Sequence, residues 1–129
     1  MAPNPARCGD FPNFEAQFSG QGIDTSGGVF TVDSSGCQNI STGEVFDLTA
    51  VDTYADGSSV NIQAASFTLG FDSATCVSTN SYPVFYVVAG GTGQFAGASG
   101  FGWFEFASND PGCNGELAPS YVWFRGVVN

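Results

Sequence analysis

The chain of 129 residues contains no histidine and only two basic residues, Arg7 and Arg125, against twelve Asp and Glu, for a formal net charge of −10 at pH 7. A surface of this charge repels phosphate backbones and anionic membranes, whereas nucleic-acid binding needs clustered Lys and Arg. Serine or cysteine hydrolysis lacks its usual base, because no histidine is present. The composition therefore argues against nucleic acids as partners and against a hydrolase of that kind.

Long apolar runs are also missing. No run reaches the roughly 18 residues of a membrane span, and no basic start followed by an apolar stretch marks a signal peptide. The sequence begins Met1-Ala-Pro-Asn-Pro-Ala, which resembles an initiator methionine in front of the N-terminus of a mature, processed protein. We therefore expect a secreted protein without its signal peptide. The length predicts a single domain. We expect this domain, a barrel, over residues 13–129, preceded by an N-terminal arm over residues 1–12 that Cys8 tethers.

The four cysteines form no CxxC pair, and they stand at Cys8, Cys37, Cys76 and Cys113. Without that spacing and without histidine, the chain lacks the usual zinc-binding pattern, and we expect no metal and no cofactor. Two disulfides are the better interpretation, and disulfides indicate an oxidising, extracellular setting.

No segment of the chain holds an amphipathic helical period, whereas alternating, β-rich runs recur about every dozen residues. The sequence therefore predicts an all-β fold. The expected strands cover residues 13–20, 28–34, 44–55, 58–70, 82–89, 100–107 and 118–128, and an eighth strand would fall in 37–42.

Asp56-Gly57 stands between two long β-rich runs and predicts a two-residue type I′ hairpin. That turn pairs Tyr54 with Ser59 and Asp52 with Asn61. The deeper part of the same face would hold Phe46, Leu48 and Phe67. Neither face of this hairpin is cleanly polar, which favours a closed, up-and-down, calycin-like barrel of seven or eight strands over an open sheet with one wet side.

The last two expected strands also have aromatic residues on both faces. A loop around 109–112 would place Trp103 beside Tyr121 and Phe101 beside Trp123. One aromatic set must then lie outside the barrel, and an exposed aromatic face usually marks a partner surface. We expect a homodimer or homotrimer; the alternative is that loops or the N-terminal arm cover this face.

Up-and-down order brings all four cysteines to one end of the barrel. The most natural of the three connectivities is Cys8 with Cys37 and Cys76 with Cys113, because each bond then joins neighbouring segments. The glycine-rich turns at 20–28, 56–57 and 90–100 fall at the opposite end. A ligand would enter through this glycine end.

The run Gly90-Gly91-Thr92-Gly93-Gln94-Phe95-Ala96-Gly97-Ala98-Ser99-Gly100 resembles the G-G-T-G-x-F-x-G-A-x-G signature of the allene oxide cyclase and dirigent barrel superfamily. The resemblance covers these residues and implies an eight-stranded antiparallel barrel, commonly dimeric or trimeric, with a largely apolar cavity. Family members act on oxylipin epoxides, steer phenoxy-radical coupling or cyclise polyketide-like substrates. The signature is a structural corner, so it assigns no catalytic residue.

Candidate site residues come from side-chain chemistry. Arg125, expected near Ser99, could bind a carboxylate or stabilise an enolate. Asp52 near the glycine end could serve as a general acid if an apolar wall raises its pKa. Glu105, among aromatic neighbours, is the acid expected to be buried or paired. The candidate catalytic residues are thus Arg125, Asp52 and Glu105, and the candidate ligand contacts are Tyr54, Asn61, Phe101, Trp103, Tyr121 and Trp123.

Three functions are consistent with these residues. The first is a secreted barrel that binds a small apolar or amphiphilic molecule and catalyses its cyclisation or isomerisation without a cofactor. The second is a lipocalin-like binding protein with no chemistry. The third is a structural or interaction module whose barrel is filled by its own thirteen phenylalanines.

Overall fold

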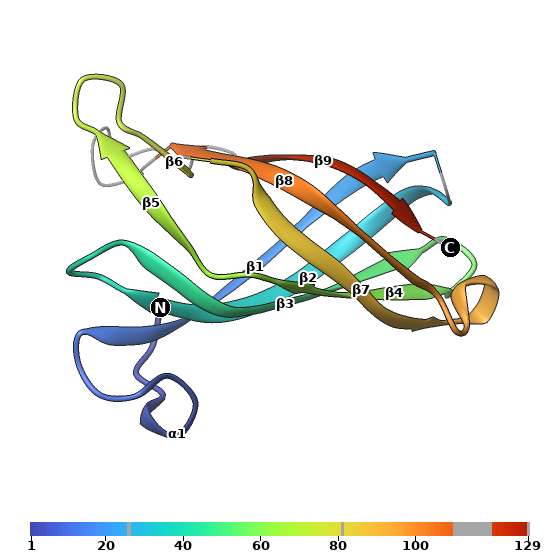
Figure 1. Ribbon diagram of the computed structural model, residues 1–129, viewed down its shortest axis with the longest axis horizontal. Helices are drawn as coiled ribbons and strands as arrows, with labels where there is room; N and C mark the ends of the chain where they lie inside the picture. The colour runs from blue at the N-terminus through green and yellow to red at the C-terminus, as the bar shows by residue number, and fades with distance from the viewer. Residues whose placement is uncertain (26, 81, 110–119, 129) are drawn as a thin grey trace.

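The computed structural model describes residues 1–25, 27–80, 82–109 and 120–128 (Figure 1). A short helix, α1, precedes a set of antiparallel strands. The elements of this part of the chain are α1 (Pro5–Cys8), β1 (Asn13–Asp24), β2 (Gly28–Asn39), β3 (Glu44–Tyr54), β4 (Ser59–Ala64), β5 (Phe67–Asp72), β6 (Val77–Asn80), β7 (Val84–Thr92), the 3₁₀ turn η1 (Gly93–Phe95), β8 (Ser99–Asn109) and β9 (Ser120–Val128).

The sheet is an up-and-down meander in which two of the long strands are interrupted. β3 pairs with β4 along Thr49–Thr53 and with β5 at Glu44 and Val45, in one continuous register. β7 and β6 in turn both pair with β8. β4 with β5, and β6 with β7, therefore act as two long broken strands, and the all-β, antiparallel, up-and-down prediction is confirmed.

The predicted closure into a barrel is not observed. Across the described residues the pairing runs from β1 to β9 without a bond between these two outer strands, so the sheet is strongly twisted but open (Figure 1). The eighth strand expected in 37–42 is also wrong. Residues 37–39 continue β2, and the additional strand is β6.

The β3–β4 hairpin differs from the predicted two-residue turn by one position. Asp52 pairs with Val60 and Thr53 with Ser59, and Tyr54 N–H donates to the Ser58 carbonyl over 2.8 Å. A type I′ turn needs positive φ at Asp56 as well as at Gly57, but of the two only Gly57 has it, at 85°. The result is a three-residue loop with a left-handed glycine. One residue of slip moves Asn61 to the opposite face from Asp52.

The β8–β9 pairing keeps the predicted parity but is displaced along the strand. Trp103 pairs with Arg125 instead of Tyr121, and Phe101 with Val127 instead of Trp123. The physical reason is a longer connection than expected, since Ser108 already pairs with Ser120.

One face of the sheet forms the hydrophobic core. Aromatic rings contribute much of it: Phe67 meets Phe104 edge to face with centroids 5.6 Å apart, and Tyr54 contacts Phe95 at 4.9 Å. The buried cluster consists of Phe30, Val45, Tyr54, Val60, Phe67, Val84, Tyr86, Val88, Ala98 and Phe104. Side chains of the chain itself thus fill this part of the concave face.

The two ends of the sheet differ as expected. Figure 1 shows α1 and the β5–β6 turn at one end and the β3–β4 and β7–β8 connections at the other. Cys8 and Cys37 form a disulfide with Cα atoms 5.5 Å apart, which confirms this predicted pair. Cys76 is disulfide-bonded as well. Cys113 lies outside the described residues, so its pairing with Cys76 stays a prediction. In the described ranges, no helix has the length and apolar character needed to cross a membrane.

Candidate functional site

Asp52 is a buried carboxylic acid on the core face of β3. It stands in a row with Gly20, Val32 and Val60, its cross-strand neighbours in register, and its exposed fraction is 6%. Its Oδ1 atom has no hydrogen-bond partner among the described residues. Burial, and secondarily the negative charge of Asp24, raise the pKa of Asp52 from its ordinary 3.8 to about 7. The sequence hypothesis of an acid against an apolar wall matches this environment.

Two phenols stand near this acid. The Tyr54 hydroxyl donates a 2.5 Å hydrogen bond to Asp24 Oδ2, while Asp24 Oδ1 accepts from the Gly27 N–H at 2.8 Å. Burial raises the pKa of Tyr54, and the bond to Asp24 raises it further. Burial also raises the pKa of Tyr86, with added effects from the charges of Asp52 and Asp24. Both phenols therefore stay protonated at neutral pH, and the Tyr54 hydroxyl uses its proton in the bond to Asp24.

The glycine turns meet at this end of the sheet, as predicted. Ser58 donates its N–H to Asp56 Oδ1 and its hydroxyl to Asp56 Oδ2, and the Ser58 Oγ accepts from the N–H of Gln94 at 3.0 Å. A Cβ on Gly93 would lie 2.4 Å from that Oγ, so only glycine permits this approach. The hydrogen bond from the Ser58 N–H, and after it the one from the Ser58 hydroxyl, lower the pKa of Asp56. The β3–β4 loop and the glycine run of 90–100 are thereby clamped together.

The other predicted site residues do not join Asp52 and Tyr54. Asn61 is exposed on the opposite face because of the register slip described above. Glu105 was expected to be buried or paired, but it is exposed, since it alternates with buried Phe104. Phe101 and Trp103 are likewise exposed, at 51% and 47%. The predicted set thus divides between the two faces of the sheet.

Three further candidates belong to β9. Arg125 pairs with Trp103, not near Ser99 as predicted, Trp123 pairs with Glu105, and Tyr121 pairs with Ala107. Their backbone register is described, whereas their side chains lie outside the described part of the structure.

An aromatic cluster lies on the face away from the core. The rings of Phe85, Phe101 and Trp103 contact one another with centroids 5.8–6.2 Å apart, and Phe85 is 41% exposed. The expected exposed aromatic face is thus present on β7 and β8.

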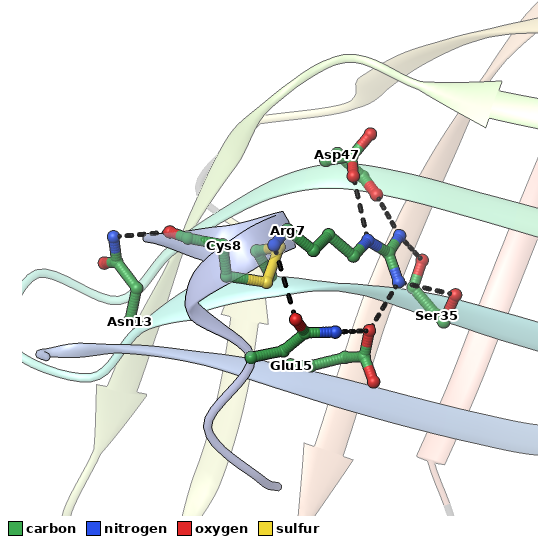
Figure 2. The surroundings of a disulfide bond; sticks show 8 residues. Arg7, Cys8, Asn13, Glu15, Ser35 and Asp47 are labelled. Atoms are coloured by element: carbon green, nitrogen blue, oxygen red, sulfur yellow. Dashed lines mark hydrogen bonds and ion pairs between the residues drawn. A yellow bond between two sulfur atoms is a disulfide. The ribbon is translucent and has the colours of Figure 1, made fainter. Parts of the chain in front are cut away.

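Arg7 has a role that the sequence did not suggest. The register between β2 and β3 shifts after Ser35, and Asp47 in this bulge has a φ of 51°. The Arg7 guanidinium donates to the Asp47 carbonyl and Oδ2, both at 2.9 Å, to Ser35 Oγ at 3.0 Å and to Glu15 Oε2 at 3.1 Å (Figure 2). The bonds to Asp47 and Glu15 raise the pKa of Arg7 further. Arg7 therefore fixes α1 to the bulge beside the Cys8–Cys37 bond and is not free for a ligand.

A hollow of about 600 Å³ lies over β1, β2 and β3. Three consecutive residues of each strand line it: Gln17, Phe18 and Ser19; Asp33, Ser34 and Ser35; and Thr49, Ala50 and Val51. Phe18, Ser34 and Ala50 form one core-face row, and the rows on both sides of it belong to the opposite face. The neighbouring core-face residues, such as Val32 and Asp52, do not line the hollow. The hollow therefore opens on the face away from the core.

Comparisons with known proteins give no relative. No family model, no curated protein and no solved structure matches the chain. Within the described residues, no group of three or more Cys, Asp or Glu side chains could hold a metal ion.

Proposed function

We propose that this protein is a secreted binding protein for a small amphiphilic molecule, held on the core face of the curled sheet with Asp52 as its polar contact. The supporting observation is the Asp52 carboxyl group, which is almost fully buried and has an Oδ1 atom without a partner. Buried polar groups are normally hydrogen-bonded, and one that is not indicates a missing partner. A ligand atom at this place would supply it.

The row that contains Asp52 is open toward β1. Gly20, the β1 residue of this row, is exposed. A Cβ placed on Gly20 would contact only the Val32 side chain, at 3.7 Å. The next row is closed instead, because the ring of Phe30 lies against Gly22, where a Cβ would come within 2.4 Å of it. A ligand would therefore approach Asp52 over Gly20 and Val32.

Exposed apolar side chains lie beside the path over Gly20 and Val32. Phe18 occupies the core-face row beside Gly20, paired with Ser34, and is 48% exposed. Ile62, in register with Ala50 of that row, is partly buried. An apolar body resting on Phe18 with a polar head at Asp52 suits an amphiphile, in keeping with sites that combine apolar walls and few polar groups.

A second candidate is proton transfer to the bound molecule. A carboxylic acid with a pKa near 7 is suited to general acid–base work at neutral pH. This favours a cofactor-independent cyclisation or isomerisation, the chemistry that the resemblance of residues 90–100 to the allene oxide cyclase and dirigent superfamily implies. The Cys76–Cys113 bond is part of the same proposal.

The test compares two carboxylates on opposite faces. Nile red, a neutral environment-sensitive dye, is titrated into the wild-type protein below pH 7, where the protonated Asp52 can donate to the carbonyl oxygen of the dye. The titration should give saturable fluorescence. Asp52→Leu, which removes the polar contact, should weaken binding about tenfold, as expected for one lost hydrogen bond in a buried site. The exposed Asp33→Asn should leave binding unchanged. Equal affinity in all three proteins, or no saturable binding by the wild type, would refute the proposal.

A further inference from the structure

The hollow over β1–β3 is a second site, separate from the core face. The side chains that face it come from two rows in register across the three strands: Gln17, Ser35 and Thr49, and Ser19, Asp33 and Val51. Five of these six side chains can form hydrogen bonds, and the sixth, Val51, is an apolar side chain that is 39% exposed.

The charge of the hollow limits what it can hold. None of the described residues that line it is cationic. The Arg7 guanidinium contacts Ser35 of the hollow, but it is occupied by Asp47, Glu15 and Ser35 itself. Together with one carboxylate in the lining and a net charge of −10, this disfavours phosphate, sulfate or carboxylate ligands.

The hydrogen-bonding groups match hydroxyl groups in particular. A carboxylate accepts, an amide both donates and accepts, and a hydroxyl does the same. A sugar hydroxyl likewise donates and accepts, so rows of such groups, carried on strands about 4.8 Å apart, can bind hydroxyls on different carbons of a ring. Val51 offers apolar contact for its C–H face.

We infer that this hollow binds a neutral carbohydrate, with Gln17, Asp33 and Thr49 as its principal hydrogen-bonding residues. The site goes beyond the proposed function, because its two rows of hydrogen-bonding side chains lie on the other face of the sheet from Asp52. The Cys8–Cys37 bond and Arg7 hold one side of it in place through Ser35.

The experiment is a binding measurement with defined sugars. Neutral tetrasaccharides of glucose, mannose, galactose and N-acetylglucosamine are titrated into the wild-type protein and followed by calorimetry, with a sulfated tetrasaccharide alongside. We expect at least one neutral sugar to bind. Gln17→Ala and Asp33→Asn should each weaken this binding about tenfold.

Gln21→Ala is the matched control, because Gln21 is an exposed glutamine of the same strand outside the hollow. It should change affinity less than twofold, and thermal unfolding should be the same for all variants. The inference is overturned if the folded wild type binds none of the neutral sugars, if the sulfated sugar binds better, or if Gln17→Ala and Gln21→Ala behave alike.

Discussion

Asp52 makes stability depend on pH in a direction opposite to that of most acids. Its pKa is about 7 in the folded chain, against an ordinary 3.8, so the folded state retains a proton that the unfolded state releases between pH 4 and pH 7. The contribution of Asp52 to stability is present below about pH 4 and is lost as the pH rises to 7. The loss is at most about 4 kcal/mol, since each pKa unit corresponds to about 1.4 kcal/mol.

Asp52→Asn removes this titration. We expect the free energy of unfolding of the wild type to fall between pH 4.5 and pH 7.5 by more than that of Asp52→Asn, and the variant to be the more stable protein at pH 8. Denaturant unfolding at a series of pH values measures both. Parallel pH profiles for the two proteins would contradict the assigned environment of Asp52.

Arg7 should matter more than an exposed ion pair does. It binds two carbonyl groups at the β2–β3 bulge, those of Asp47 at 2.9 Å and Ser35 at 3.3 Å, in addition to its carboxylate partners. Arg7→Met leaves these groups unsatisfied, and we expect a loss of about 1–3 kcal/mol in denaturant unfolding. An exposed Asp33→Asn should cost far less. A loss below about 0.5 kcal/mol for Arg7→Met, the range of surface substitutions, would show that water replaces the guanidinium.

At the scale of the element, strands were predictable and register was not. Alternation and β-branched or aromatic runs placed β1, β2, β3 and β8 within a few residues. The two-residue turn expected at Asp56–Gly57 is wrong, because the Asp56 side chain accepts from the Ser58 N–H and only Gly57 adopts the left-handed conformation. That single residue of slip is what separated Asn61 from Asp52. Burial of Asp52 follows from alternation along β3, whereas its missing partner depends on contacts that the sequence does not encode locally.

Two glycines at connections between strands test how strictly these turns require a left-handed backbone and a close approach. Gly57 has a φ of 85° with no atom near an added Cβ, whereas at Gly43, with a φ of 78°, the Cβ would lie 2.5 Å from the Leu69 carbonyl oxygen. Gly57→Ala should cost about 1–2 kcal/mol from backbone strain alone. Gly43→Ala adds a clash with β5 and should cost more. Equal losses in thermal unfolding would mean that β5 moves away freely.

The disulfide between Cys8 and Cys37 connects the N-terminal helix to the sheet. Replacing both cysteines by alanine should lower the free energy of unfolding by about 3 kcal/mol, as for other loops of this size, here with a sequence separation of 29. Denaturant unfolding of the double variant measures the loss. An unchanged midpoint would show that Arg7 and the Ala2–Glu15 bridge hold the arm without the bond.

At the scale of the whole molecule, the two faces of one open sheet have different chemistry. The core face combines a packed aromatic cluster with Asp52, and the opposite face holds the polar hollow over β1–β3 and the aromatic cluster on β7 and β8. The up-and-down class and one disulfide could be read from the sequence. The open edge could not, because closure depends on contacts between strands at opposite ends of the chain.

The exposed cluster of Phe85, Phe101 and Trp103 sets an expectation for self-association. Two copies with a charge of −10 each repel one another, so contact through this uncharged cluster is the favourable arrangement. We expect a homodimer or homotrimer in sedimentation velocity and a monomer for Phe101→Ser/Trp103→Ser. Phe71→Ser, an equally exposed phenylalanine outside the cluster, is the control. A monomeric wild type at high concentration would contradict this expectation.

The most direct test of ligand binding at Asp52 is native mass spectrometry of the protein recovered from its own source, with Asp52→Leu expressed in the same way. The wild type should retain a small-molecule adduct, and the variant should lose it while keeping the same fold by circular dichroism. A bare wild-type chain, or the same adduct on both proteins, would contradict the account.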